Sequence, residues 1–182
     1  MRKSFNSNAT FETKRLRMRF ISENDIHAIF LNINNDKEVL KYYLDKYLEK
    51  EEDMTLNKVI KYCLENERYF FAIELKDTKE VIGMIHECST PSETFDSSEI
   101  GYAIGRKYWN QGYMSEALKA MIDFIFKTGV HKVVVSHLVG NNASKRVIEK
   151  CDLIYEGRRK EEIHYHEQYW DVDYYYLLNT SK

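Results

Sequence analysis

One stretch of the sequence, residues 98–126, constrains the fold more than any other because its hydrophobic pattern changes period midway. Its first part, from Glu99 to Ile104, interleaves β-branched and aromatic residues with small ones, as strands do. From Met114 to Phe126 the apolar residues follow one another at intervals of three and four, which is the spacing of an amphipathic helix. The sequence therefore predicts a strand, a turn and a helix, the repeating unit of many α/β proteins.

The turn in this stretch carries a glycine, Gly112, just before the expected helix. The first N–H groups of a helix lack intrahelical partners and carry a partial positive charge, so they can converge on a phosphate or pyrophosphate. Gly112 has no Cβ, which lets such a group approach the backbone closely, and Arg106 and Lys107 could add positive charge. An ordinary strand–helix connection fits the same residues. The pattern is neither a Walker loop nor a dinucleotide fingerprint, because the Gly-Lys-Ser/Thr and the three-glycine spacing are both missing.

Length and composition predict one globular domain. The chain has 182 residues, of which 43% are hydrophobic and 31% charged, as in ordinary globular proteins. The net charge of −2 does not favour a nucleic-acid partner. No apolar run approaches the roughly 18 residues of a membrane span, and the N-terminus lacks the apolar core of a signal peptide. We expect a loose segment at residues 1–10 and a folded domain at residues 11–180.

The three cysteines, Cys63, Cys88 and Cys151, are an odd number at unrelated spacings. Such spacing predicts neither a disulfide framework nor a zinc site, and it suits a reducing cytoplasm. His164 and His166 flank Tyr165 in an expected turn, but a metal would need a third ligand that the sequence does not identify. We therefore expect no metal.

The remaining periodicity predicts strands and helices in a mixed order. We expect strands at residues 13–21, 68–75, 80–87, 99–104, 132–139, 153–163 and 168–178, and helices at residues 27–33, 36–48, 54–66, 114–126 and 143–150. The strand at 132–139 is dense in β-branched residues and should be buried on both faces. Gly129 should end the preceding helix as its C′ residue.

Five motifs in order carry a family resemblance. They are Thr13-Lys-Arg-Leu-Arg-Met-Arg19, Glu99-Ile-Gly-Tyr102, Tyr108-Trp-Asn-Gln-Gly-Tyr-Met-Ser-Glu-Ala117, Asn141-Asn-Ala-Ser-Lys-Arg-Val-Ile-Glu-Lys150, and Tyr155-Glu-Gly157 followed by Trp170-Asp-Val172. With them the chain resembles the GNAT superfamily of N-acetyltransferases, specifically the branch that acetylates the N-termini of ribosomal proteins. The resemblance runs from about residue 11 to residue 178.

The resemblance implies a single-domain GNAT fold of the mixed α/β (α+β) class. Its sheet is splayed and mixed, mostly antiparallel, with helices on both faces and acetyl-CoA wedged between the strands at 99–105 and 132–139. The backbone N–H groups that would hold the pyrophosphate belong to Gln111, Gly112, Tyr113, Met114 and Ser115. Asn141 would hydrogen-bond the pantetheine arm, although a simple helix N-cap is an alternative.

The chain departs from the family pattern at three places. Asn110 and Met114 stand where the family commonly has Gly and Ala. Asn tolerates left-handed backbone angles and Met114 contributes chiefly an N–H, so we expect a weaker fit rather than lost binding. Asp152 replaces a Gly that terminates a helix, and it is a poorer terminator.

Acetyl transfer to an amine needs a proton acceptor, an oxyanion donor and a proton for the leaving thiolate. Glu99 is the candidate base because burial in an apolar strand would raise its pKa, and the family's proposed base matches it; a solvated strand-start Glu is the alternative. The backbone N–H of Ile104 is the candidate oxyanion donor. Ser144 matches the family position assigned to the acid, and a helix-start serine that caps a backbone N–H fits equally well.

The acceptor is the least constrained part of the prediction. The resemblance favours a protein N-terminal α-amine and a direct attack in a ternary complex. A small-molecule amine acetyltransferase, acting on an aminoglycoside, a polyamine or an amino acid, stays open. A CoA-binding sensor or interaction module is a third possibility. A homodimer is compatible with the sequence, but no motif requires one.

Overall fold

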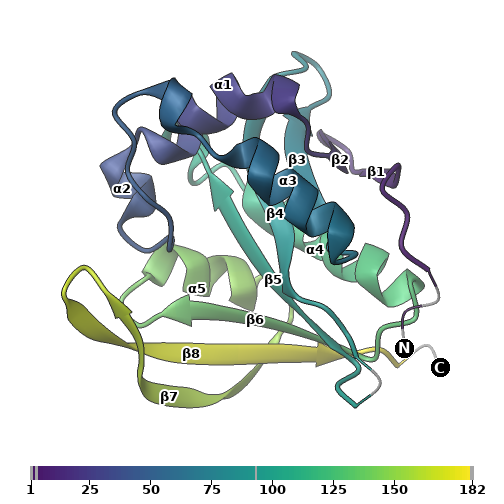
Figure 1. The fold of residues 1–182 in the computed structure, drawn as a ribbon. Coiled ribbons are helices and arrows are strands. Elements are labelled where there is room, and N and C mark those ends of the chain that lie inside the picture. The colour runs from purple at the N-terminus through teal and green to yellow at the C-terminus, as the bar shows by residue number, and fades with distance from the viewer. Residues whose placement is uncertain (1, 3, 93, 181–182) are drawn as a thin grey trace.

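The computed structural model describes residues 2, 4–92 and 94–180, and in these residues one eight-stranded sheet has the order β1-β2-β3-β4-β5-β6-β8-β7 (Figure 1). Neighbouring strands are antiparallel except β5 and β6, which run parallel. The strands are β1 (Thr10–Glu12), β2 (Leu16–Phe20), β3 (Phe70–Leu75), β4 (Val81–Ser89), β5 (Ser97–Ile104), β6 (Lys132–Leu138), β7 (Ile154–Tyr165) and β8 (Gln168–Leu178). The predicted mixed, mostly antiparallel sheet is confirmed.

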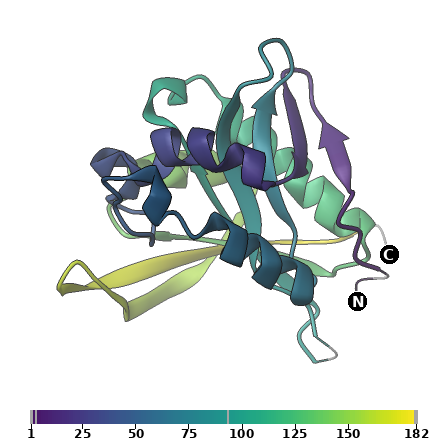
Figure 2. The same ribbon diagram turned by 45° about the horizontal axis from the view of Figure 1, so that its top comes forward.

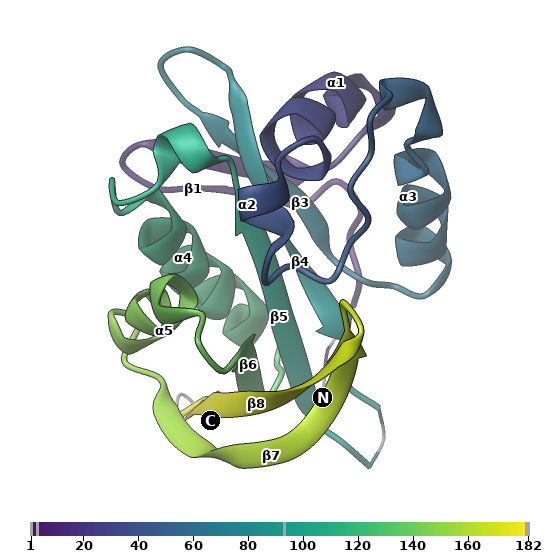
Figure 3. The same ribbon diagram turned by 90° about the vertical axis from the view of Figure 1, so that its left-hand side faces the viewer.

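Helices cover both faces of this sheet, as predicted (Figures 1 and 2). They are α1 (Ile26–Ile29), α2 (Lys37–Leu40), α3 (Leu56–Glu65), α4 (Tyr113–Lys127) and α5 (Asn142–Glu149), and a π-helical turn (Phe30–Asn34) continues α1. Helices α1 to α3 lie over one face, and α4 and α5 lie over the other (Figure 3).

Two hydrophobic clusters fill the spaces between the helices and the sheet. On β3, consecutive residues point to opposite faces, so Phe71 packs with Leu118 and Met121 of α4, whereas Phe70 packs with Ile29 and other residues of the α1–α3 layer. Strands β3 and β4 are buried on both faces for this reason, which explains their continuous apolar sequence.

Strand β6 departs from the prediction that both of its faces are buried. Val133 and Val135 are buried, but Val134 and Ser136 are only half-buried. The structural reason is the splay of the sheet. Strand β5 pairs with β6 only over residues 97–100, opposite 132–135, while β6 remains paired with β8 as far as Leu138. The ends of β5 and β6 therefore diverge, as Figure 1 shows.

The predicted helix at 36–48 is wrong beyond Leu40. Residues 41–50 form a turn, bends and irregular backbone, and the Asn34 and Asn35 side chains donate hydrogen bonds to the carbonyls of Lys46 and Leu48. The Tyr165 hydroxyl lies 3.2 Å from Leu40 O, 3.1 Å from Tyr43 O and 3.0 Å from Asp45 O. The tip of the β7–β8 hairpin thus contacts residues 40–45 through Tyr165. A sequence pattern of period 3.6 cannot reveal such a tertiary contact.

The short β1 strand at the sheet edge was not predicted. Upstream of it, Phe5 lies 5.0 Å from the ring of Tyr69, Ala9 is buried, and Arg2 pairs with the buried Glu87. The segment therefore contacts the domain, and its looseness in solution stays a prediction, as does the division at residue 10.

Three predicted turns appear with the expected backbone. Gly129 ends α4 with a φ of 98°, and Asn110 takes a φ of 59° before α4. Asp152 replaces the family's helix-ending Gly and takes a φ of 61°, so the turn forms there as well. A left-handed backbone is energetically less favourable for Asp than for Gly.

Candidate active site

A cleft of about 920 Å³ opens where β5 and β6 diverge. It passes through the splayed part of the sheet, so residues from both helical layers line it. Tyr113 and Met114 of α4 and Asn141 and Ser144 at the start of α5 lie on one side, and residues of α2, α3 and β4 lie on the other. The predicted residues Ile104, Gly112 and Ser115 also line it, whereas Gln111 and Glu99 do not.

The start of α4 has the glycine turn in which the sequence predicts an anion cradle. Gly112 is the N-cap residue with a φ of 79°, a left-handed conformation that residues with a Cβ rarely adopt. A Cβ built at Gly112 would come 3.5 Å from Nη2 of Arg15, so a guanidinium lies beside the turn. Helix α4 has 15 residues, and its first N–H groups carry the partial positive charge of a helix start.

A clamp between α4 and residues 13–15, just before β2, holds this guanidinium. Glu116 accepts hydrogen bonds from the Thr13 hydroxyl at 2.5 Å, from the Arg15 backbone N–H at 3.0 Å and from Arg15 Nε at 2.7 Å. Arg15 Nη1 donates to Gln111 O at 3.0 Å, and the guanidinium lies 4.2 Å from the centre of the Tyr113 ring. Burial acts to raise the pKa of Glu116, but the bonds from Thr13 and Arg15 outweigh it and lower the pKa.

The cation beside Gly112 is not one that the sequence suggested. Arg106 pairs with Asp36 at 3.0 Å, and Lys107 pairs with Glu80 at 2.7 Å. Arg15 is the cation beside Gly112, and it too pairs with a carboxylate, that of Glu116. Its role was missed because its motif lies nearly 100 residues away in the sequence, although Thr13, Arg15 and Glu116 all belong to quoted motifs.

Strand β5 presents backbone groups to the cleft. Gly105 N–H donates to Ile82 O, and in an antiparallel ladder the main-chain groups of successive residues alternate in direction. The N–H and C=O of Ile104 therefore point away from β4, towards the side where β6 has diverged. The Ile104 carbonyl accepts a hydrogen bond from Trp109 Nε1 at 2.9 Å.

The start of α5 brings a serine and a tyrosine together. The Asn141 side chain caps the helix by accepting a hydrogen bond from Ser144 N–H at 3.1 Å. The Ser144 hydroxyl is therefore free of a capping role, and it lies 2.8 Å from the hydroxyl of Tyr102 on β5. Burial raises the pKa of Tyr102 well above its usual range, so this hydroxyl keeps its proton at neutral pH. Tyr102 stands in the quoted Glu-Ile-Gly-Tyr motif, but the sequence did not single it out.

Glu99 lies on β5 just below the point where the strands diverge. It is half-buried, and its Oε1 accepts a hydrogen bond at 2.9 Å from the hydroxyl of Ser136, which lines the cleft. Glu99 thus contacts the cleft through Ser136 and is not the fully solvated residue of the alternative interpretation. Its role as a base stays a prediction.

A histidine and a cysteine of β4 line the cleft on the side of α1–α3. His86 Nε2 lies 3.1 Å from the Tyr43 hydroxyl, and burial lowers the pKa of His86, which keeps the imidazole neutral. Cys88 lies next to it, with Sγ 3.9 Å from His86 Nδ1. Cys88 is exposed to the cleft, yet the surrounding protein and the Glu99 carboxylate raise the pKa of its thiol to about 12. A thiol of this kind is not a thiolate nucleophile at neutral pH.

Gly101 explains how these side chains fit over β5. A Cβ at Gly101 would come 2.7 Å from the Cys88 sulfur and 3.0 Å from the His86 ring. Only glycine lets both side chains lie against the strand.

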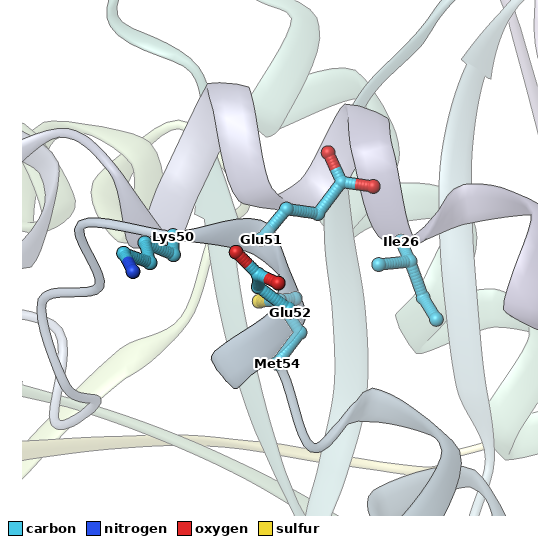
Figure 4. Close-up of a pocket in the computed structure, with 5 residues that line it drawn as sticks. All are labelled: Ile26, Lys50, Glu51, Glu52 and Met54. Atoms are coloured by element: carbon cyan, nitrogen blue, oxygen red, sulfur yellow. The ribbon is translucent and has the colours of Figure 1, made fainter.

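The acidic residues at 49–53 lie apart from this cleft. Ile26, Lys50, Glu51, Glu52 and Met54 surround a separate shallow depression (Figure 4). Glu51 pairs with the exposed His27 at 2.6 Å. These acids are therefore part of a solvated surface.

The described part of the chain contains no group of three or more His, Cys, Asp or Glu residues arranged to hold a metal. Within the same residues, no helix has both the length and the apolar character needed to cross a bilayer.

The comparison with protein families decides what this architecture is. Residues 15–154 match the model described as the acetyltransferase (GNAT) domain. The chain belongs to the GNAT family of acetyltransferases. As a GNAT protein it is 28% identical to the uncharacterized N-acetyltransferase YoaA of Bacillus subtilis over 174 residues, which cover 94% of the chain and 97% of YoaA. It is 25% identical to the ribosomal-protein-serine acetyltransferase of Escherichia coli over 173 residues, which cover 93% of the chain and 96% of that relative.

Solved structures of GNAT proteins share the fold. An acetyltransferase of the GNAT family from Bacillus anthracis superposes with a TM-score of 0.81 at 27% identity, covering 94% of this chain and 99% of that one. The spermidine N-acetyltransferase of Vibrio cholerae, solved with CoA and spermine, superposes with a TM-score of 0.79 at 22% identity. The match covers 92% of this chain and 98% of that one. The predicted GNAT fold is confirmed, and these relatives are named for different acceptors.

Proposed function

We propose that this GNAT protein transfers the acetyl group of acetyl-CoA to a primary amine by direct attack in a ternary complex. The observation that carries the proposal is the cleft between the diverging ends of β5 and β6, which has the cradle at Gly112 on one side and Glu99 beside it on the other. Enzyme activity is shared by the family, and the assignments to individual residues are our own.

The residues around Gly112 suit a pyrophosphate. The left-handed turn leaves room for a phosphate at a position without a Cβ, and the Arg15 guanidinium, which is paired with Glu116, lies beside it. The backbone N–H groups of residues 111–115 would bind the pyrophosphate, and the Asn141 side chain would support the pantetheine arm while it caps α5. When bound, acetyl-CoA supplies a thioester whose carbonyl carbon accepts the amine.

Glu99 would take the proton of the attacking amine, directly or through a water molecule. Ser136 donates to one oxygen of Glu99 and so orients the carboxylate. Neutral His86 is the second base that the cleft offers. We favour Glu99 because the imidazole of His86 is occupied by the Tyr43 hydroxyl.

The Ile104 N–H would donate to the developing oxyanion, because it points to the open side of β5. The pair of hydroxyls on Ser144 and Tyr102 would return a proton to the leaving thiolate. The high pKa of the Cys88 thiol supports direct transfer rather than an acetyl-cysteine intermediate.

The acceptor we propose first is a protein N-terminal α-amine, as the relative named for ribosomal-protein serine acetylation suggests. A small-molecule amine is the second candidate, supported by the structural likeness to a spermidine acetyltransferase. A CoA-binding sensor without turnover is the alternative of another class. We expect the protein to work in the cytoplasm, where its free cysteines stay reduced.

The test is release of CoA thiol from acetyl-CoA in the presence of N-terminal peptides, polyamines, aminoglycosides and free amino acids. A peptide substrate with kcat/KM of about 10⁴ M⁻¹s⁻¹ or more would support the first acceptor. A small-amine substrate would replace the acceptor and keep the chemistry. No turnover with any amine, while acetyl-CoA still raises the melting temperature, would favour the sensor.

A further inference from the structure

Arg68 lies just before β3 and lines the cleft on the side of α2, α3 and β4. Two contacts fix its position. Its Nη1 donates to the Cys88 carbonyl at 2.7 Å, and its guanidinium lies 5.1 Å from the centre of the Tyr62 ring. These contacts tie the side chain to β4 on one side and to α3 on the other. A guanidinium held in this way is pre-organised to bind a further group.

Among the described residues, Arg68 makes no ion pair with a carboxylate. Arg15, Arg19 and Arg158, by contrast, each pair with an acidic side chain within 3.0 Å. The Nε atom of Arg68 is buried and has no hydrogen-bond partner. Arg68 therefore places in the wall of the cleft a guanidinium with which no described carboxylate pairs, and a carboxylate is the group that fits it best.

Arg68 and Glu99 both lie near Cys88. Arg68 donates to the Cys88 carbonyl, and strand β4 is irregular at Cys88, where the next residue, Ser89, pairs with Glu99. Both charges act on the Cys88 thiol, since Glu99 raises its pKa and Arg68 lowers it; Glu87, which pairs with Arg2, also raises it. A cation thus lines the cleft near Glu99, whose partner Ser136 lines the same cleft.

We propose that Arg68 binds a carboxylate of the acceptor while the acceptor's amine lies at Glu99, so that the preferred acceptors are primary amines that carry a nearby carboxylate. This inference rests on the proposed function. The carboxylate has two possible sources, the α-carboxylate of a free amino acid or an acidic side chain close to the N-terminus of a peptide. Leu44, Val59 and Tyr62 expose apolar surface around the same part of the cleft, which suits an acceptor with an apolar body.

The experiment compares matched acceptors that differ in one charge. L-Phenylalanine is paired with L-phenylalaninamide, and the amidated tripeptide Ala-Glu-Phe is paired with Ala-Gln-Phe. The full chain and its variants Arg68→Gln and Arg68→Lys are measured with acetyl-CoA by thiol release. The control variant is Lys41→Gln, which also removes a positive charge that lines the cleft. Binding of each acceptor to the CoA-saturated protein is measured in parallel by calorimetry, so that a result is obtained with or without turnover.

We expect the wild type to prefer the carboxylate member of one pair by about tenfold or more in kcat/KM, chiefly through KM, as for a charge-assisted hydrogen bond. The amino-acid pair or the peptide pair identifies the source. Arg68→Gln should abolish the preference, Arg68→Lys should keep part of it, and Lys41→Gln should leave it unchanged. A structural role alone would weaken both members of a pair equally.

Three results would overturn the inference: equal rates and affinities within both pairs, a preference that survives in Arg68→Gln, or no binding of any member of either pair. Selective binding of the carboxylate members without any turnover would contradict the proposed function and leave the inference standing.

Discussion

The clamp formed by Glu116 predicts a coupled effect on stability and on cofactor affinity. In Glu116→Gln, the amide oxygen can still accept from Thr13, but the amide nitrogen would face the Nε donor of Arg15 in place of a carboxylate oxygen. A hydrogen bond to a charged group contributes about 1.5–3 kcal/mol. Because the side chain of Arg15 is 39% exposed and that of Glu116 is 21% exposed, we reduce this to about 1–2 kcal/mol.

For a chain of this length, such a loss lowers the melting temperature by about 2–8 °C. Arg15 also holds the Gln111 carbonyl beside the cradle, so the KM for acetyl-CoA should rise by about five- to tenfold with a smaller change in kcat. Differential scanning fluorimetry and initial-rate kinetics measure the two effects.

The matched control is Glu80→Gln, which removes a carboxylate from a more exposed ion pair with Lys107 on the neighbouring turn. It should leave the KM for acetyl-CoA unchanged and shift the melting temperature very little. The reasoning is refuted if Glu116→Gln behaves like the wild type, or if Glu80→Gln raises the KM equally.

Three further predictions concern the proposed cradle at Gly112, the hydroxyls of Tyr102 and Ser144, and the stability of the fold at acid pH. Gly112→Ala places a Cβ at a φ of 79°, so it should cost about 1–2 kcal/mol in thermal unfolding and weaken the stabilisation by CoA; an unchanged CoA affinity would contradict the cradle. Tyr102→Phe and Ser144→Ala should each lower kcat by about tenfold or more, and the double variant should lose no more than the worse single one, whereas additive losses would separate the two hydroxyls. Burial acts to raise the pKa of Asp25, but the hydrogen bonds from Arg19 and Ser22 outweigh it and lower the pKa. The ionised Asp25 carboxylate therefore stabilises the folded protein above about pH 4, and this contribution disappears as the pH falls further. In urea unfolding, Asp25→Asn should therefore cost about 2–3 kcal/mol at pH 6 and clearly less at pH 3, and an equal cost at both values would contradict the assignment.

Local pattern was enough to predict the strands and helices that pack by simple periodicity. Residues 113–127 form α4 within one residue of the predicted start, and β3 and β4 pair as a hairpin at the two strands predicted there. The prediction at 41–50 failed because contacts from distant residues, among them the Tyr165 hydroxyl more than 100 residues away, hold this segment out of a helix. Val59, an apolar residue of α3, is 41% exposed and lines the cleft.

The candidate site likewise combines features that local sequence predicts with residues that only the fold brings together. The glycine turn at Gly112, where we propose the cradle, follows from local chemistry, because a helix start with a glycine needs only neighbouring residues. The other residues of the candidate site come from distant motifs: Arg15 reaches the turn from the bend just before β2, and Tyr102 meets Ser144 only because β5 and α5 border one cleft. Arg68 and Cys88 lie outside the quoted motifs, and no sequence signal in this chain marked them.

The most direct test of the central claim is release of CoA thiol by the wild type and by Glu99→Gln with the best acceptor from the panel. We predict turnover by the wild type and a loss of about 10²- to 10⁴-fold in kcat for Glu99→Gln, with the same rise in melting temperature on adding CoA. Turnover by Glu99→Gln at the wild-type rate would contradict the assignment of Glu99 as the base.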